Sequence, residues 1–265
     1  MTNALAYFFV FLGIQILTSS VVQGGYSLLT KTPVAELPTL ATVITMVLFS
    51  AVTLVVFLRL RWATTSRRYV RSKPWTVLTW CVIAAVGAIV PSLFLQGLLP
   101  EFPEWAQKMA EEADRNMAQL MMMPVGYMVL ALLPPVVEEL VFRGAILKSL
   151  LRWQPQRRWA MIALSALLFA VAHLNPAQMP HAFVIGLLLG WMYMRTGSVV
   201  PGIAFHWANN TAAYAMFHIY HNPQSLADIV GPGRRPVLMA LAFSLCILLP
   251  ALYQLHLRMR RPSGV

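Results

Sequence analysis

Long runs of apolar residues alternate with short polar segments along most of the chain. A run of about 20 apolar residues is long enough to cross the hydrocarbon layer of a membrane. Eight segments are predicted to do so: 4–29, 39–60, 75–98, 124–147, 159–175, 181–195, 198–218 and 236–257. The sixth is short, and Pro134-Pro135 breaks the fourth. We therefore expect an all-α fold, a polytopic bundle of about eight transmembrane helices that forms one membrane-embedded domain over residues 1–265.

One segment between these runs has a different pattern, which is typical of an amphipathic helix. Over residues 101–120, apolar side chains recur every three or four positions at Trp105, Met109, Ala113, Met117 and Leu120. This spacing places them on one face of a helix. Such a helix is predicted to lie on the membrane surface. It either packs on the bundle or acts as a lid over a site.

Composition and charge support a membrane protein rather than a nucleic-acid-binding protein. Of 265 residues, 58% are hydrophobic and 11% are charged, whereas soluble domains average about 25% charged residues. The net charge of +11 comes from basic clusters at 59–73, 148–158 and 258–261. Basic residues in alternate loops mark the cytoplasmic side, so both termini are predicted to be cytoplasmic. The arginine-rich, compact loops favour a bacterial inner membrane, with lipid as a partner and no nucleic acid.

A few polar residues interrupt the predicted spans where apolar residues would insert more easily. They are Glu138, Glu139, Arg143, His173, His206 and Asn210. Residues four apart share one helix face, so Glu139 and Arg143 are expected to form an ion pair. That pairing leaves Glu138 free for another role. His206 and Asn210 have the same spacing and are expected to project into one space.

These polar groups admit more than one function. Ionisable residues inside a membrane usually face the bundle interior or a wet cavity. A glutamate there could act as a general base on water, and histidine and asparagine side chains could stabilise an oxyanion. The same residues could instead serve a non-catalytic scaffold or a transporter. Transporters tend to have paired broken helices, whereas Pro134-Pro135 is the one clear break in this sequence.

Three stretches carry a resemblance to a known family. They read Glu138-Glu139-Leu-Val-Phe-Arg143, Phe169-Ala-Val-Ala-His173 and His206-Trp-Ala-Asn-Asn210. In order and spacing, they resemble the EExxxR, FxxxH and HxxxN motifs of the CAAX protease and bacteriocin-processing (CPBP, or Abi) family of intramembrane endopeptidases. The resemblance covers roughly residues 125–215, the expected catalytic core. It implies a membrane hydrolase that cleaves a membrane-associated or lipidated peptide or membrane-protein substrate.

The resemblance also implies a role for each matching residue. The catalytic residues would be Glu138 as general base, His173 as its partner, and His206 and Asn210 as oxyanion donors. The supporting residues would be Glu139, Arg143 and Phe169.

A metal is the open alternative for the chemistry. Two histidines and a glutamate resemble a catalytic zinc site with three protein ligands and a water. In this chain they would be Glu138, His173 and His206. The sequence has no HExxH motif, and with Glu138 as a ligand the reaction would need another base. We therefore favour a metal-free, glutamate-type protease, with zinc or another divalent metal as the alternative.

Overall fold

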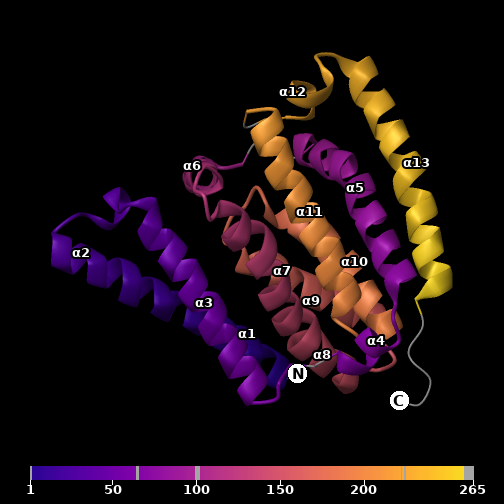
Figure 1. Ribbon diagram of the computed structural model, residues 1–265, viewed down its shortest axis with the longest axis horizontal. Coiled ribbons are helices and arrows are strands. Elements are labelled where there is room, and N and C mark those ends of the chain that lie inside the picture. The colour runs from indigo at the N-terminus through magenta and orange to yellow at the C-terminus, as the bar shows by residue number, and fades with distance from the viewer. Residues whose placement is uncertain (1, 64–65, 99–101, 222, 224, 260–265) are drawn as a thin grey trace.

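The chain folds into helices that pack side by side over most of their length (Figure 1). The computed structural model describes residues 2–63, 66–98, 102–221, 223 and 225–259. Its α-helices are α1 (Thr2–Ser19), α2 (Gly25–Thr30), α3 (Thr39–Arg59), α4 (Arg67–Arg71), α5 (Trp75–Gly97), α6 (Glu104–Met121), α7 (Leu133–Glu138), α8 (Lys148–Trp153), α9 (Arg158–Ala172), α10 (Met179–Thr196), α11 (Val200–Ile219), α12 (Leu226–Val230) and α13 (Arg234–Arg258). No strand occurs in the described ranges, which confirms the all-α class.

Within the described residues, three π-helical segments and one 3₁₀ turn occur between these α-helices. The 3₁₀ turn covers Val34–Glu36, and the π-helical segments cover Ser20–Gly24, Met128–Leu132 and Glu139–Leu147. The first π segment joins α1 to α2. The other two lie on either side of α7, so that residues 126–153 form one long, irregular helix. The motif with both acids therefore lies at a junction between α-helical and π-helical backbone.

Four helices in the described part of the chain are long and apolar enough to cross a membrane. They are Asn3–Thr30, Thr39–Arg59, Trp75–Gly97 and Arg234–Arg258. They coincide with the first, second, third and eighth predicted spans, which supports an integral membrane protein. The apolar helix α9 has 15 residues, and α10 and α11 have 18 and 20. The total of eight spans therefore stays a prediction.

The helices bury two main groups of apolar side chains, and α10 contributes to both. One group joins α1 and α3 to the 126–153 helix and to α9. The other joins α5 and α13, which lie side by side, to α11. Because α10 packs into both groups, it holds α9 and α11 close to the helix that carries the acids (Figure 1).

Two glycines bring α9 and α10 into close contact. A Cβ atom added at Gly186 would lie 2.9 Å from the Cβ of Ala166, and one added at Gly190 would lie 2.7 Å from Cγ2 of Ile162. Side-chain carbon atoms do not approach this closely without a shift of one helix. The GxxxG spacing therefore serves helix packing, as in many membrane helices.

The described basic clusters lie at one end of the bundle. The end of α3, the short helix α4, the α8–α9 connection and the end of α13 all gather there (Figure 1). Arg260 and Arg261 lie outside the described residues. The position of these clusters at one end agrees with the alternation of basic loops from which the topology was predicted. The cytoplasmic location of that end and of the termini stays a prediction.

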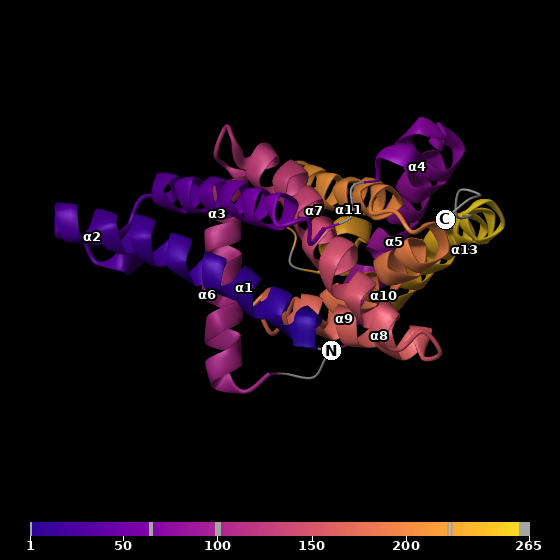
Figure 2. The same ribbon diagram turned by 90° about the horizontal axis from the view of Figure 1, so that it is seen from below.

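The predicted amphipathic segment 101–120 forms α6, which runs across α3 (Figure 2). Position 101 lies outside the described residues. The apolar stripe is not buried as a unit, because Trp105 is 63% and Met109 43% exposed, whereas Leu120 is 5% exposed. At the C-terminal end of the stripe, Met117 joins the cluster around Leu120. The N-terminal half of α6 is instead buried at Ala106 and Ala110, beside the stripe.

Candidate active site

The predicted ion pair between Glu139 and Arg143 is present at the centre of the bundle. Arg143 Nη1 donates to Glu139 Oε1 at 2.7 Å, and the two side chains are 1% and 0% exposed. Arg143 Nη2 also donates to the Gly186 carbonyl at 3.2 Å. The guanidinium carbon lies 4.4 Å from the centre of the Phe169 ring. The pair thus ties the 126–153 helix to α9 and α10, which fits the predicted supporting role of these residues.

A glycine on α11 provides the space that Glu139 occupies. A Cβ atom added at Gly202 would overlap Oε2 of Glu139. The carboxylate therefore packs directly on the backbone of α11. Four residues further along α11, His206 Nδ1 lies 3.6 Å from Glu139 Oε1. Because of this close packing, the structural acid fixes the position of the helix that carries the third motif.

Glu138, the neighbouring acid, lies in a different environment. Its side chain is 21% exposed, and its Oε2 atom is buried without a hydrogen-bond partner among the described residues. This oxygen lies 3.8 Å from Nε2 of His206. The imidazole of His206 therefore lies between the two acids, with one nitrogen near each. Both separations are slightly longer than a hydrogen bond, as is common for catalytic groups without substrate.

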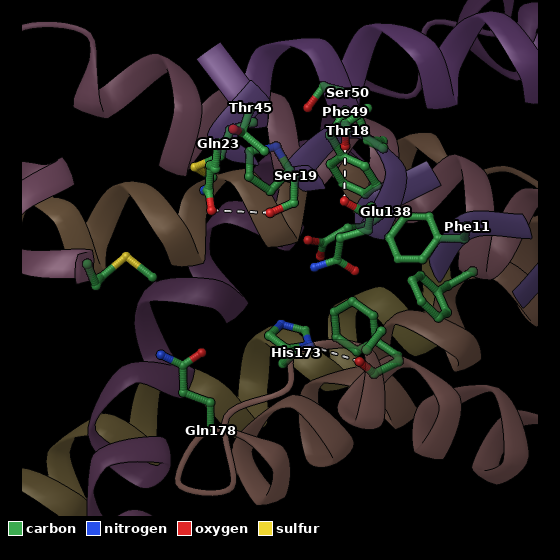
Figure 3. A pocket seen from close by; sticks show the side chains of 18 residues that line it. Phe11, Thr18, Ser19, Gln23, Thr45, Phe49, Ser50, Glu138, His173 and Gln178 are labelled. Atoms are coloured by element: carbon green, nitrogen blue, oxygen red, sulfur yellow. Dashed lines mark hydrogen bonds between the residues drawn. The ribbon is translucent and has the colours of Figure 1, made fainter. Parts of the chain in front are cut away.

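His173 is held with one ring nitrogen on its own helix. Nδ1 lies 2.8 Å from the carbonyl oxygen of Phe169, as the dashed line in Figure 3 shows. A carbonyl can only accept, so Nδ1 carries the hydrogen and a neutral ring keeps an acceptor lone pair on Nε2. The structure corrects the predicted span 159–175, because α9 ends at Ala172 and His173 caps it. The imidazole thus lies at a helix end, beside the cavity.

Asn210 makes a contact that the sequence did not predict. Its Nδ2 atom donates to the backbone carbonyl of Leu130 at 3.1 Å. In an α-helix this carbonyl would accept from residue 134, and in a π-helix from residue 135. Both are prolines, which have no N–H to donate. Asn210 therefore satisfies a carbonyl left unpaired by the Pro134-Pro135 break, and its second N–H remains for another acceptor.

Glu138 and His173 lie at the junction of two cavities, of about 370 and 340 Å³. Volumes of this size are typical of small-molecule and peptide sites. The larger cavity, which we call the α1–α3 chamber, extends between the polar residues of α1 and α3 (Figure 3). The smaller cavity, the α10–α11 chamber, is lined by His206, Asn210 and His181, among others. Phe169 lines both. The three motifs therefore converge on one continuous space.

Two groups of cavity residues were not predicted from the sequence. His181 lies near the start of α10 and lines the α10–α11 chamber. It lies at the edge of a predicted span, where ionisable residues are common, so its position in the sequence did not indicate a functional site. The polar residues of α1 and α3 are uncharged, and membrane helices tolerate such residues without a functional reason. The one feature of the sequence that could have indicated their role is their spacing along a single helix face.

The described residues do not form a metal site as they stand. They contain no group of three or more His, Cys, Asp or Glu side chains that are placed to hold an ion. Glu138, His173 and His206, the alternative zinc ligands, line one cavity but are not arranged as a ligand set. We therefore derive no step through a metal, and the choice between the two protease types is left to experiment.

Comparison with known proteins finds one family model that matches the region around this site. Residues 120–212 match the family model described as type II CAAX prenyl endopeptidase Rce1-like. The match covers the 126–153 helix and extends through His206 and Asn210. No curated protein and no solved structure matches the chain. The family match confirms the resemblance drawn from the three motifs: residues 120–212, which contain all three, are similar to CAAX-type endopeptidases of the Rce1-like family.

Proposed function

We propose that the protein is an intramembrane endopeptidase in which Glu138 activates a water molecule for attack on a peptide bond. The observation that carries this proposal is the contrast between the two acids. Glu139 is fully buried and bound by Arg143 through Oε1, although its Oε2 also has no hydrogen-bond partner among the described residues. Glu138 is 21% exposed, forms no salt bridge with an Arg or Lys among the described residues, and lies beside His206 in a cavity that also contains His173. A free carboxylate in such a place is suited to accept a proton from water.

The reaction would proceed by general-base hydrolysis. Glu138 takes a proton from water as the water oxygen attacks the scissile carbonyl carbon. The proton then passes to the leaving nitrogen as the carbon–nitrogen bond breaks, which yields an amine and a carboxylic acid that then ionises. His173, through its free Nε2, orients the attacking water with Glu138. His206 and the second N–H of Asn210 donate to the oxyanion, where one such donor is typically worth about 10²–10³ in rate.

The proposal is tested by comparing peptide termini in native membranes that express wild type or Glu138→Gln at equal levels. This substitution keeps the size of the side chain and removes the base. New termini should appear with wild type and be absent with Glu138→Gln. Glu36→Gln is the matched control, because Glu36 is an exposed acid that lines neither chamber, and it should give the wild-type profile.

Identical profiles for wild type and Glu138→Gln, with both proteins inserted and folded, would contradict the proposal and favour a scaffold or transporter. The glutamate-type mechanism has a separate test on the purified protein. After exhaustive treatment with a chelator and measurement of bound metal, cleavage of the identified substrate should continue at the untreated rate. Loss of cleavage that returns with zinc would instead establish the metallo-type.

A further inference from the structure

The α1–α3 chamber has a lining that is unusual for a membrane interior. Gln15, Thr18, Ser19 and Gln23 lie along one face of α1 and the π-helical segment after it, at spacings of three and four residues. Thr45 and Ser50 face them from α3. Figure 3 shows Thr18, Ser19, Gln23, Thr45 and Ser50 around the open space, across from His173 and Gln178. All these residues are polar and uncharged, in helices that are otherwise strongly apolar.

The chamber offers both acceptor oxygens and the amide N–H groups of Gln15, Gln23 and Gln178, and one buried amide oxygen lacks a partner within the described ranges. The Thr18 hydroxyl donates to the Ile14 carbonyl at 2.7 Å, and the Thr45 hydroxyl donates to the Ala41 carbonyl at 2.8 Å. Each hydroxyl has one hydrogen, so its oxygen can then only accept. Gln15 Oε1 is buried and has no hydrogen-bond partner among the described residues. The chamber therefore fits a ligand that brings an N–H donor for this oxygen and carbonyl groups that can accept from the glutamine amides.

The inner end of the chamber is aromatic. Phe11 lies 5.2 Å from both Phe49 and Phe142, measured between ring centres, and Phe142 lies 5.1 Å from Phe169. The row of rings thus runs from α1 and α3 to Phe169, which contacts His173 at 4.7 Å. An apolar side chain could pack on these rings while polar groups remain near Gln15. Gln15 and these rings line the same cavity as Glu138, and Figure 3 shows Phe11 beside Glu138.

The donors that this chamber requires exclude several ligand classes. An acyl or isoprenoid chain has no hydrogen-bond donor and would leave the buried Gln15 oxygen unpaired, which is unfavourable. Ester carbonyls and phosphates of lipid headgroups could accept from the glutamine amides, but they would leave the buried Gln15 oxygen unpaired. A phosphate would in addition bring negative charge next to Glu138. Backbone amides of an extended peptide carry N–H donors, together with side chains that can enter the aromatic end.

We propose that the α1–α3 chamber is a substrate subsite that binds an uncharged peptide segment adjacent to the scissile bond, with Gln15 accepting a backbone N–H and an apolar side chain against Phe11 and Phe49. This proposal rests on the proposed endopeptidase function and extends it. The α10–α11 chamber, with His206 and Asn210, then holds the reacting carbonyl. Gln15 and Ser19 are positioning residues, which act by binding the peptide rather than by chemistry.

The test uses a quenched fluorescent peptide that contains the ten residues around a cleavage site defined by the terminus comparison. Gln15→Leu should raise KM about threefold to tenfold, the loss of one hydrogen bond to the substrate, while kcat changes less. Ser19→Ala is a second variant with a smaller change in volume, and it should also raise KM. Ser20→Ala is the matched control, because Ser20 is exposed and lies outside the chamber.

A second series removes the donor from the substrate instead of the acceptor from the protein. Peptides that are N-methylated at single positions lack one backbone N–H each. At one position, N-methylation should raise the KM of wild type. The same N-methylated peptide should give no further increase in KM with Gln15→Leu, because both changes remove the same hydrogen bond. Thermal unfolding of each variant, measured in parallel, identifies any loss of fold.

The outcomes separate the two proposals. If wild type cleaves the peptide and Gln15→Leu and Ser19→Ala both have the same KM as Ser20→Ala, the subsite proposal is wrong. The proposed endopeptidase function is not affected by that result. Independent, additive effects of N-methylation and Gln15→Leu at every position would also overturn the subsite. If wild type and Glu138→Gln generate the same termini, the proposed endopeptidase function is wrong, and the subsite proposal, which rests on it, is wrong too.

Discussion

Two kinds of helix make up this molecule, and they differ in the regularity of their backbone. Thr39–Arg59, Trp75–Gly97 and Arg234–Arg258 are unbroken α-helices that are apolar enough to cross a membrane. Large apolar side chains of α13, such as Met239 and Phe243, are more than 70% exposed, as expected for contact with lipid. The 126–153 helix instead passes through two π-helical segments around α7, and it contains the buried ions.

The comparison shows where irregular backbone occurs in this fold. Each π-helical segment contributes a residue to the cavity: Gln23 from Ser20–Gly24, Leu130 from Met128–Leu132 and Phe142 from Glu139–Leu147. Short π-helical segments inside α-helices are frequently found at functional sites. In lipid, an unpaired carbonyl is costly, and the Leu130 carbonyl is tolerated because Asn210 bonds it. At this carbonyl, a side chain from another helix thus satisfies a group that the irregular backbone leaves unpaired.

The largest effect is expected from breaking the buried ion pair. Arg143→Met leaves Glu139 charged and unpaired, which should destabilise the fold by about 3–5 kcal/mol. Lys108→Met is the matched control, because Lys108 and Glu104 have the same i,i+4 spacing and the same 2.7 Å distance but are 68% and 81% exposed. Its effect should be below about 1 kcal/mol. Denaturant titration in detergent measures both, and equal effects would contradict the structural role of the buried pair.

A smaller effect is expected where helices meet at glycine. Gly202→Ala forces the Glu139 carboxylate away from α11, and overpacking of this kind typically costs about 1–3 kcal/mol. Gly13→Ala in α1 is the control, because a Cβ there meets nothing within 4 Å. Alanine should stabilise that helix slightly. A Gly202→Ala protein as stable as wild type would show that Glu139 does not need its contact with α11.

The smallest effect concerns the proline break. Asn210→Ala leaves the Leu130 carbonyl unpaired and should cost about 1–2 kcal/mol. Adding Pro134→Ala supplies the missing backbone N–H, so stability should return in the double variant. Cleavage should not return, because the second N–H of Asn210 is proposed to stabilise the oxyanion. Recovery of both stability and cleavage would reduce Asn210 to a structural residue.

Local features of the site could be predicted from the sequence, whereas long-range ones could not. The Glu139–Arg143 pair follows from spacing along one helix, and the packing of Gly186 and Gly190 follows from a local motif. The bond from Asn210 to Leu130 joins residues 80 positions apart and depends on how α11 packs. The exposure of Trp105 and Met109 also depends on packing, since the N-terminal half of α6 is buried at Ala106 and Ala110 rather than at the predicted stripe.

The polar lining of the α1–α3 chamber shows why uncharged residues are hard to interpret. Gln15 and Thr45 interrupt apolar helices as isolated polar positions, and a threonine that bonds its own helix is common in membrane spans. Their common role emerges only when α1 and α3 are placed opposite each other beside Glu138. Charged residues were easier to interpret, because a charged side chain inside a membrane has a high free-energy cost and is usually functional.

The most direct test of the account compares Glu138→Gln with Glu139→Gln in purified protein reconstituted into liposomes. Cleavage rate and thermal unfolding are measured on the same preparations, with wild type alongside. The account predicts that Glu138→Gln unfolds at the wild-type temperature and loses at least about 10²-fold in cleavage rate, whereas Glu139→Gln loses stability. Wild-type cleavage by a folded Glu138→Gln protein would contradict the central claim that this glutamate performs the chemistry.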